Sequence, residues 1–379
     1  MVPPIARGKK NAKNPPIFSH EFIIQNHGDI VSCLAMIAVS GLFFESSSPL
    51  AIVFIALQHN VTLNVDKIPP LLPPHSLTYT NGLKDIFTIF FYTLICIVAH
   101  AVIQEYILDK LNRRMHLSKL KHSKFNESGQ LLVFYAASAV TGYYILIKED
   151  YLSRISGLWD AYPHLYMSFW VKLYFILQIS HWVHCYPELY FQKVKKEEIV
   201  QRLQYYTIYL TFITVCYILN LSLLGLLLLT IHYTAEFLFH LSRLLYFAEK
   251  ESLANSGFKV WNVAFVVTRL ATITLSILTL WYGLSKTSVH VVDWSTGNFN
   301  TFFIRVNCLV ALFLLQAYIM WNFITFHLRR FREKKDISPQ SQSAGTASGK
   351  KQAPSSSSSS SPVPGSGKKQ KKKGCCCCC

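Results

Sequence analysis

Residues 223–247 read LLGLLLLTIHYTAEFLFHLSRLLYF, and this stretch decides the class of fold. A helix that crosses lipid needs roughly 20 mostly apolar residues, because hydrocarbon cannot hydrogen-bond the backbone and the helix must satisfy its own N–H and C=O groups. The stretch has that length, and leucine fills residues 226–229. It therefore predicts a membrane-spanning helix.

Seven further stretches fit the same pattern, at residues 30–44, 86–103, 131–147, 165–185, 205–219, 260–284 and 302–326. The predicted fold class is therefore all-α: a polytopic membrane helix bundle with about eight transmembrane helices over residues 30–326. Residues 205–247 would alternatively hold one long span and an interfacial helix. Because that stretch is long enough for two crossings with a link near Asn220, two spans are the preferred interpretation.

The bulk composition separates this chain from soluble proteins. Charged residues make up 15% of it, against about 25% in soluble domains, and hydrophobic residues make up 51%. The net charge of +17 does not indicate DNA binding, because Lys and Arg stand in short blocks between apolar runs. Five of the ten cysteines lie in apolar runs and the other five are residues 375–379, with no spacing typical of a disulfide framework or a zinc site. We therefore predict no cofactor and no metal.

The basic residues predict the orientation of the spans, since Lys and Arg beside a span stay in the cytosol. They gather on every second flank, in blocks at residues 7–13, 110–124, 193–202, 250–259 and 329–335. Both ends of the chain are therefore predicted to be cytosolic, with a basic N-terminus at residues 1–29. Residues 45–85 become a lumenal loop in this arrangement. Its apolar piece, residues 51–57, is too short to cross the membrane.

Two further features depend on this orientation. The sequon Asn60-Val61-Thr62 falls in the lumenal loop, where N-glycosylation occurs, whereas Asn126-Glu127-Ser128 falls in the cytosol and should stay unmodified. Residues 327–379 become a basic cytosolic tail. From Ser338 onward Ser, Gly, Gln, Lys and Pro dominate, and such a composition cannot bury enough apolar surface to fold, so this tail is predicted to be disordered.

Ionisable residues inside a span are costly and usually face a bundle interior or a wet cavity. The sixth span has the densest set, at offsets of four, four and three residues along one helix face: His232, Glu236, His240 and Arg243. Three interpretations compete: a metal or proton-transfer site, a polar cavity for a substrate chain, and a structural ion-paired seam. A metal would need at least three ligands, which His232 with Glu236 does not supply. A cavity or a seam is therefore favoured, and no catalytic residue is predicted.

The fourth and seventh spans add polar candidates of the same kind: Lys172, Gln178, His181, His184 and Arg269. Gln178 and His181 share their helix face with Cys185 and Glu188. A buried Lys172 needs a carboxylate or carbonyl partner, and Glu236 is a candidate for it. Together with the sixth-span set, these residues are the predicted lining of a polar groove within the membrane.

Several segments resemble one family of membrane proteins. They are Ser19-His20-Glu21-Phe22, His100-Ala101-Val102-Ile103-Gln104-Glu105-Tyr106, residues 122–131 (HSKFNESGQL), residues 186–193 (YPELYFQK), Glu236-Phe237-Leu238-Phe239-His240 and Thr296-Gly297-Asn298-Phe299-Asn300. On these segments the chain, from about residue 19 to residue 333, resembles the translocating chain-associated membrane proteins.

The resemblance implies a function in protein translocation. It implies an accessory of the Sec translocon in the endoplasmic reticulum membrane that is no enzyme and whose partners are the Sec channel, signal sequences, nascent transmembrane segments and membrane lipids. A groove with polar side chains would lower the cost of moving a charged or weakly hydrophobic segment into the bilayer. The basic block at residues 110–124 would dock on ribosomal RNA or anionic lipid, or would act only as a topogenic signal, which every topology needs.

The resemblance also implies a rival function, because that family belongs to a broader group that includes the ceramide synthases. A core similar to their TLC domain would run from about residue 110 to residue 326, and the rival is a lipid-handling protein: a sphingolipid-related acyltransferase or a lipid sensor. In those enzymes a His-His pair opens one span and a His-Asp motif follows in the next. Here Tyr205 and Tyr206 match the pair, Tyr233 matches the Asp, and His232 alone remains. Tyrosine, with an unperturbed pKa of about 10, is a poor general base, so these departures argue against acyl transfer.

Overall fold

The computed structural model describes residue 16 and residues 19–61, 77–151, 154–160 and 162–343. The chain divides into two compact units, Met1–Met320 and Trp321–Cys379. The longest helix, α12 (Phe302–Ser343), begins in the first unit and continues into the second. The fold and every site below belong to the first unit.

A helix lies over each of the eight stretches that the sequence predicts to span. These helices are α2 (His27–Ser40), α4 (Asp85–Val102), α6 (Lys119–Lys148), α8 (Phe169–Phe191), α9 (Lys196–Ile218), α10 (Ser222–Phe247), α11 (Glu251–Ser276) and α12. Six helical stretches are long and apolar enough to cross a membrane: His20–Phe43, Asp85–Met115, Lys121–Lys148, Ser222–Phe247, Glu251–Thr287 and Phe302–Glu333. The chain is therefore a polytopic, largely α-helical membrane protein, as predicted.

The helices α8 and α9 are the two predicted spans outside this set of six. The polar and charged residues of α8 and α9 lower the mean hydropathy of each helix. In α8 these polar residues face inward, since Lys172, Gln178, His184 and Glu188 are all buried among neighbouring helices. A helix enclosed by protein does not have to be apolar to lie within a membrane bundle.

Short elements connect and extend the long helices. They are α1 (His20–Gln25), η1 (Gly41–Phe43), α3 (Ser48–Ile55), the π-helical η3 (Ile103–Leu108), α5 (Asp109–Met115), α7 (Gly157–Asp160), the π-helical η4 (Ile277–Gly283) and η5 (Leu284–Thr287). The strands β1 (Asn60–Val61), β2 (Thr78–Tyr79) and β3 (Met167–Ser168) form a small antiparallel sheet in the order β1-β2-β3. Because β2 and β3 shortly precede α4 and α8, the sheet ties together the starts of these two helices.

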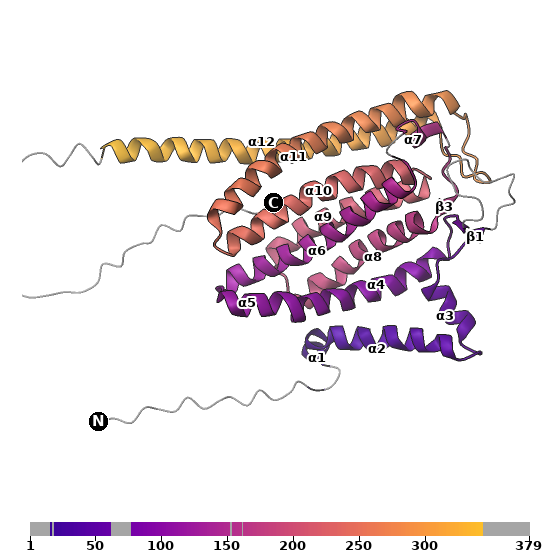
Figure 1. Cartoon of the computed structure of the whole chain (residues 1–379), viewed down its shortest axis with the longest axis horizontal. Helices are drawn as coiled ribbons and strands as arrows, with labels where there is room; N and C mark the ends of the chain where they lie inside the picture. Colours follow the sequence, from indigo (N-terminus) through magenta and orange to yellow (C-terminus); the bar gives the residue numbers. More distant parts are fainter. Residues whose placement is uncertain (1–15, 17–18, 62–76, 152–153, 161, 344–379) are drawn as a thin grey trace, which may run out of the picture. The chain divides into compact units, whose positions relative to one another are not determined.

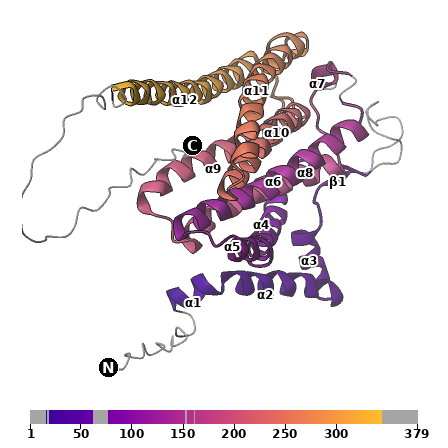
Figure 2. The same cartoon turned by 60° about the vertical axis from the view of Figure 1, so that its left-hand side comes forward.

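The helices α4, α6, α8, α9 and α10 lie alongside one another, and α11 packs against α10 (Figures 1 and 2). Within this arrangement α10 packs most extensively, on α6 and on α11, while α8 lies against α4 and α9. The main core contains the fully buried rings of Tyr135, Trp182 and Tyr233. The polar residues of α8 and α10 therefore lie close to the centre of the bundle.

The link predicted near Asn220 is confirmed, because α9 ends at Ile218 and α10 begins at Ser222. Asn220 takes a left-handed backbone with φ of 56°. Asparagine tolerates this conformation better than most residues, and it lets the chain reverse in a few residues. The Asn220 side chain donates to the Gly297 carbonyl at 2.8 Å and accepts from Asn81 Nδ2 at 3.1 Å.

Three predicted connections contain more structure than expected. The basic block at residues 110–124, for which no secondary structure was predicted, lies in α5 and the start of α6. The predicted loop at residues 45–85 contains α3, β1 and β2, and its residues 62–76 lie outside the described part. Although residues 327–379 were predicted to be disordered, α12 continues to Ser343, and residues 344–379 lie outside the described part.

Candidate functional site

Lys172 forms the most deeply buried ion pair that the described residues contain. Its Nζ lies 2.8 Å from Asp85 Oδ1 and donates to the carbonyls of Gln58 and Thr80, each at 2.7 Å. Lys172 is 0% exposed and Asp85 2% exposed. The predicted pairing of Lys172 with Glu236 is therefore wrong: the partner comes from the start of α4 and from the segments around the small sheet.

Asp85 is held by several groups at once. Its Oδ2 accepts from the Tyr217 hydroxyl at 2.7 Å and from the Gly82 backbone N–H at 2.9 Å. The pair therefore joins α4, α8 and α9 at one end of the bundle. Because both charges are paired and no longer reach solvent, this predicted groove residue has a structural role.

Gln178 belongs to a second sealed network, at the interface of α6, α8 and α10. Its Nε2 donates to Ser138 Oγ, and its Oε1 accepts from the Tyr233 hydroxyl, both at 2.9 Å. Trp182 Nε1 donates to the same tyrosine oxygen at 3.3 Å. Buried polar groups rarely lack partners, and this network provides them across three helices.

The central polar cluster consists of Tyr135, Tyr205, Tyr209, His232, Glu236 and Arg269, from four helices. The hydroxyls of Tyr135 and Tyr205 are 2.6 Å apart, and Tyr205 donates to the Tyr209 hydroxyl at 3.4 Å. Tyr209 bonds in turn to Nε2 of His232. Three of the predicted groove residues, His232, Glu236 and Arg269, thus belong to this cluster. Tyr205, which matches the first residue of the ceramide synthase His pair, belongs to it as well.

Both ring nitrogens of His232 have partners in the central polar cluster. Nδ1 bonds to an Arg269 guanidinium N–H, which can only donate, so Nδ1 accepts. In the neutral ring Nε2 then carries the proton and donates to the Tyr209 oxygen. The second guanidinium arm of Arg269 donates to Gln316 Oε1 at 3.0 Å. His232 is therefore held in one tautomer, with no free nitrogen to act as a base.

Glu236 is the carboxylate of the central polar cluster, and its side chain is partly exposed. Its Oε1 lies 3.9 Å from His232 Nε2, and the two side chains are 16% and 17% exposed. His240 and Arg243, the other predicted members of this helix face, are 3% and 4% exposed. Arg243 covers the rings of Phe239 and Phe247, while His240 stacks on Tyr135. The predicted stripe therefore divides into a partly exposed pair, His232 and Glu236, and two sealed residues.

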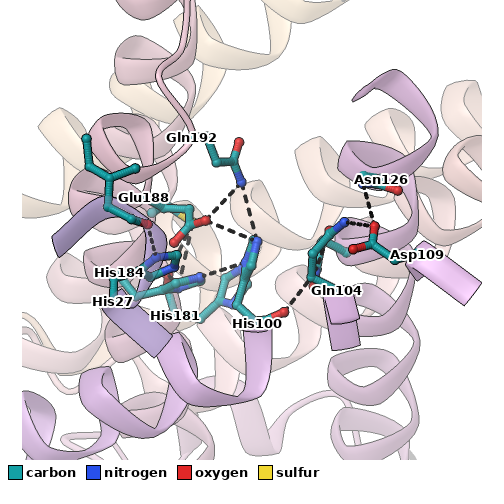
Figure 3. Close-up of polar contacts among 12 residues, drawn as sticks. His27, His100, Gln104, Asp109, Asn126, His181, His184, Glu188 and Gln192 are labelled. Atoms are coloured by element: carbon teal, nitrogen blue, oxygen red, sulfur yellow. Dashed lines mark hydrogen bonds and ion pairs between the residues drawn. The ribbon is translucent and has the colours of Figure 1, made fainter. Parts of the chain in front are cut away.

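A third group, the histidine cluster, contains His100, His181, His184, Cys185 and Glu188 (Figure 3). His184 Nδ1 bonds to the His181 carbonyl, and His184 Nε2 lies 3.5 Å from His100 Nδ1. His100 Nε2 lies 3.3 Å from Glu188 Oε1. His100 comes from α4 and the other four from α8, so the cluster spans the α4–α8 contact.

A ladder of amides continues from the histidine cluster toward α6 (Figure 3). Gln130 Nε2 donates to the His100 carbonyl at 3.0 Å, and Gln104 Nε2 donates to Asp109 Oδ1 at 2.7 Å. Asn126 Nδ2 reaches the same carboxylate at 3.5 Å. Gln104 lies in the π-helical η3, and such turns are frequent at functional sites.

The structure distributes the nine predicted groove residues among separate places. Lys172 and Gln178 have sealed structural partners, and His181 and His184 join the histidine cluster. His232, Glu236 and Arg269 join the central polar cluster, while His240 and Arg243 are buried outside it. Sequence reasoning missed several partners that complete these groups, namely Asp85, His100, Tyr135, Tyr209 and Tyr217. Asp85 and His100 lie near the two ends of the span predicted at residues 86–103, and an ionisable residue at such a place could have been included among the candidates. The tyrosines carry no such signal, because most aromatic residues in a span simply pack.

Comparisons with known proteins agree with the fold. A family model described as a TLC domain matches residues 124–325. Translocating chain-associated membrane protein 2 of Mus musculus is 46% identical over 325 residues and that of Homo sapiens is 45% identical over 325 residues, in each case covering 86% of both chains. Ceramide synthase 4 of Bos taurus is 23% identical over 232 residues, which is 60% of this chain and 56% of that protein. The chain belongs to the translocating chain-associated membrane protein family, within the larger group of TLC domain proteins.

Proposed function

We propose that this protein is an accessory of the Sec translocon in the endoplasmic reticulum membrane. It contacts signal sequences and nascent transmembrane segments beside the channel and helps them enter the lipid. The observation that carries the proposal is the 45–46% identity over 86% of the chain to proteins named for their association with translocating chains. Conservation of a fold over that length favours conservation of the surfaces through which such proteins act.

The proposed contact surface consists of the polar residues of the bundle that remain partly exposed. His232 and Glu236 keep 17% and 16% of their side-chain surface, and His181 is also only partly buried. A charge at the centre of a bilayer costs about 2.5–3.5 kcal/mol on insertion scales. A polar group at the bundle surface lowers that cost for a passing segment by offering it a hydrogen-bonding partner.

We propose that the protein is not an acyltransferase. Tyr205 and Tyr209, with the hydroxyl of Tyr135, hydrogen-bond one another within the central polar cluster. His232 has both ring nitrogens engaged. In the ceramide synthase pattern the matched positions would have to supply the base for acyl transfer to an amine, and neither the bonded tyrosines nor His232 has a free basic nitrogen to do so.

Its proposed partners are the Sec channel, translocating chains and membrane lipids, with the ribosome as a further candidate. The basic block supports contact with polyanions, since Lys110, Arg113 and Arg114 lie together on the short helix α5. Contact with ribosomal RNA would be electrostatic and would weaken steeply with salt. Cosedimentation with ribosomes that persists after these three residues are neutralised would remove this role.

Site-specific photocrosslinking tests the main proposal. A photoreactive phenylalanine analogue replaces Phe237, next to Glu236, or Val183, between His181 and His184. The protein is then assembled into microsomes with ribosomes stalled on a short secretory precursor. We expect adducts to the nascent signal sequence from both positions.

The matched control is the same analogue at Val140, which is 70% exposed on α6. This position should crosslink to lipid and not to the precursor. Adducts that form only to lipid from Phe237 and Val183 as well would contradict the accessory role. They would favour the second candidate, a lipid-handling bundle, to which the TLC domain match over residues 124–325 points.

A further inference from the structure

The helix α8 carries four side chains with metal-binding chemistry in one row. His181, His184, Cys185 and Glu188 stand at offsets of three, one and three residues and therefore share a helix face. One ligand atom from each of His181, His184 and Cys185 lies within 4.8 Å of the other two. Two imidazoles and a thiol are the ligands that zinc takes most often.

Buried acceptors in this row lack donors. His181 Nε2 and Glu188 Oε2 are buried and have no hydrogen-bond partner among the described residues. Such orphaned atoms cost free energy unless a partner supplies positive charge or a proton. Within the described part of the chain, no Lys or Arg forms an ion pair with these side chains, and the ion-pair partner of Glu188 is His100. A cation bound by His181 Nε2 would satisfy that atom and oppose the charge of the Glu188 carboxylate.

Contacts with a neighbouring ring and a backbone carbonyl fix the imidazole rings of His181 and His184, as is common for histidines that bind metals. His181 stacks on Phe134, with ring centroids 3.3 Å apart and planes at 4°, which leaves the in-plane lone pairs free. His184 Nδ1 donates to the His181 carbonyl, so Nε2 keeps a lone pair. The neighbour of Nε2 is His100 Nδ1 at 3.5 Å, which is longer than most hydrogen bonds and which a bound metal would replace. A histidine that binds a metal through one nitrogen commonly donates its other N–H to a carbonyl or carboxylate.

Outer groups orient the fourth residue of the row. His100 Nε2 lies 3.3 Å from Glu188 Oε1, and Gln192 Nε2 donates to the same oxygen at 3.0 Å. These contacts occupy Oε1 and leave Oε2 as the oxygen without a partner. Glu188 lies outside the group of three residues whose ligand atoms are within 4.8 Å of one another, so it supplies a negative charge near that group rather than a fourth ligand (Figure 3).

We propose that His181, His184 and Cys185 bind a zinc ion within the bundle, with the Glu188 carboxylate on the same helix face. Cys185 loses its thiol proton on binding, and the thiolate and carboxylate together balance the charge of Zn²⁺. The sequence argues against a zinc site because its spacing matches no familiar cysteine–histidine pattern, whereas the structure brings a single helix face and the orphaned atoms together. This inference does not depend on a role in translocation.

The test is metal binding by the full chain in detergent micelles, with serine in place of the five cysteines at residues 375–379. That background is essential, because a run of five thiols would itself bind zinc. The protein is stripped with a chelator, incubated with Zn²⁺ and desalted, and its metal content is measured. We expect about one zinc ion per chain.

The variant Cys185→Ser combined with His184→Asn should lose this ion. Cys216→Ser is the matched control, because Cys216 is 5% exposed in α9 and lies outside the row. Replacing an outer partner, by His100→Ala, should weaken zinc binding by about 10–100-fold. The same zinc content in the double variant as in the Cys216→Ser control would overturn the proposal.

Cobalt substitution keeps the test decisive if the double variant fails to fold. Co²⁺ bound to the otherwise unaltered row should give the absorption of a tetrahedral ion with a thiolate-to-cobalt charge-transfer band. Cys185→Ser alone should abolish that band. A spectrum that is unchanged by Cys185→Ser, or one that shows only octahedral cobalt, would also overturn the proposal.

Discussion

At the residue scale, a buried charge has consequences set by its partners rather than by its own identity. Lys172 looked like a functional residue because an unpaired ammonium is very costly inside a bundle. Asp85, two carbonyls and the surrounding packing remove that cost. The same reasoning makes the partly exposed Glu236 the better candidate for contact with another chain.

The Lys172–Asp85 pair yields a stability prediction. Lys172→Met should destabilise the protein by about 3–5 kcal/mol, because it leaves the Asp85 carboxylate buried without its counter-charge. The measurement is the thermal unfolding temperature of the purified protein in detergent micelles. Lys84→Met is the matched control, since Lys84 is exposed and close in sequence to Asp85.

A double variant separates the charge effect from lost packing. Lys172→Met with Asp85→Asn removes both charges, so it should recover part of the stability that the single variant loses. If the double variant were as unstable as the sum of both single changes, the ion pair would not be the cause.

At the element scale, the packing of α6 on α10 depends on a glycine. A Cβ added at Gly142 would lie 2.2 Å from Thr230 Oγ1, closer than atoms can approach. Small residues at helix contacts let backbones approach closely within a membrane. Without this approach the Tyr135, Gln178 and Tyr233 side chains would not meet across the helices.

This contact predicts a paired effect of two substitutions. Gly142→Ala should destabilise the bundle by about 1–3 kcal/mol through overpacking. Thr230→Ala in the same chain should restore part of that loss, because it removes the clashing oxygen. Gly157→Ala serves as the control, since a Cβ there would meet nothing within 4 Å. Thermal unfolding of the four proteins in detergent compares them directly, and no rescue by Thr230→Ala would mean that the clash is relieved elsewhere.

At the scale of the whole molecule, glycosylation tests the orientation predicted from the basic blocks. Asn60 is exposed in β1, whereas Asn126 is partly buried in α6 and bonds to Asn112 and Asp109. We expect an endoglycosidase-sensitive glycan that Asn60→Gln abolishes and Asn126→Gln leaves intact. Gel mobility after synthesis in microsomes measures it. A glycan that persists in Asn60→Gln and is lost in Asn126→Gln would place the loops on the opposite sides.

Translocation assays test the proposed contact surface as a unit. Removing His181, His232 and Glu236 together, each by change to Gln, should reduce insertion of weakly hydrophobic signal sequences by about tenfold, which corresponds to about 1.4 kcal/mol. Strongly hydrophobic signals should insert almost normally, because they gain enough from lipid alone. Lys148→Gln, an exposed change on α6, is the control. Equal loss for weak and strong signals would contradict the proposed groove.

The sequence by itself determined the membrane class, the eight long helices and the link at Asn220. These follow from local rules, since each span must hydrogen-bond its own backbone and must be apolar where lipid surrounds it. The apolar pattern could not predict that α12 continues to Ser343, because that pattern ends where the span ends, whereas the helix continues beyond the apolar stretch.

Only the tertiary structure decided which polar residues meet. Lys172 pairs with Asp85 far along the chain, Tyr135 and Tyr209 complete the group around His232, and His100 joins the row on α8. Helix periodicity fixes which residues share a face, but it does not say which face of another helix lies opposite. That choice depends on packing among all the helices, so the difference between a sealed seam and an accessible site appears only in three dimensions.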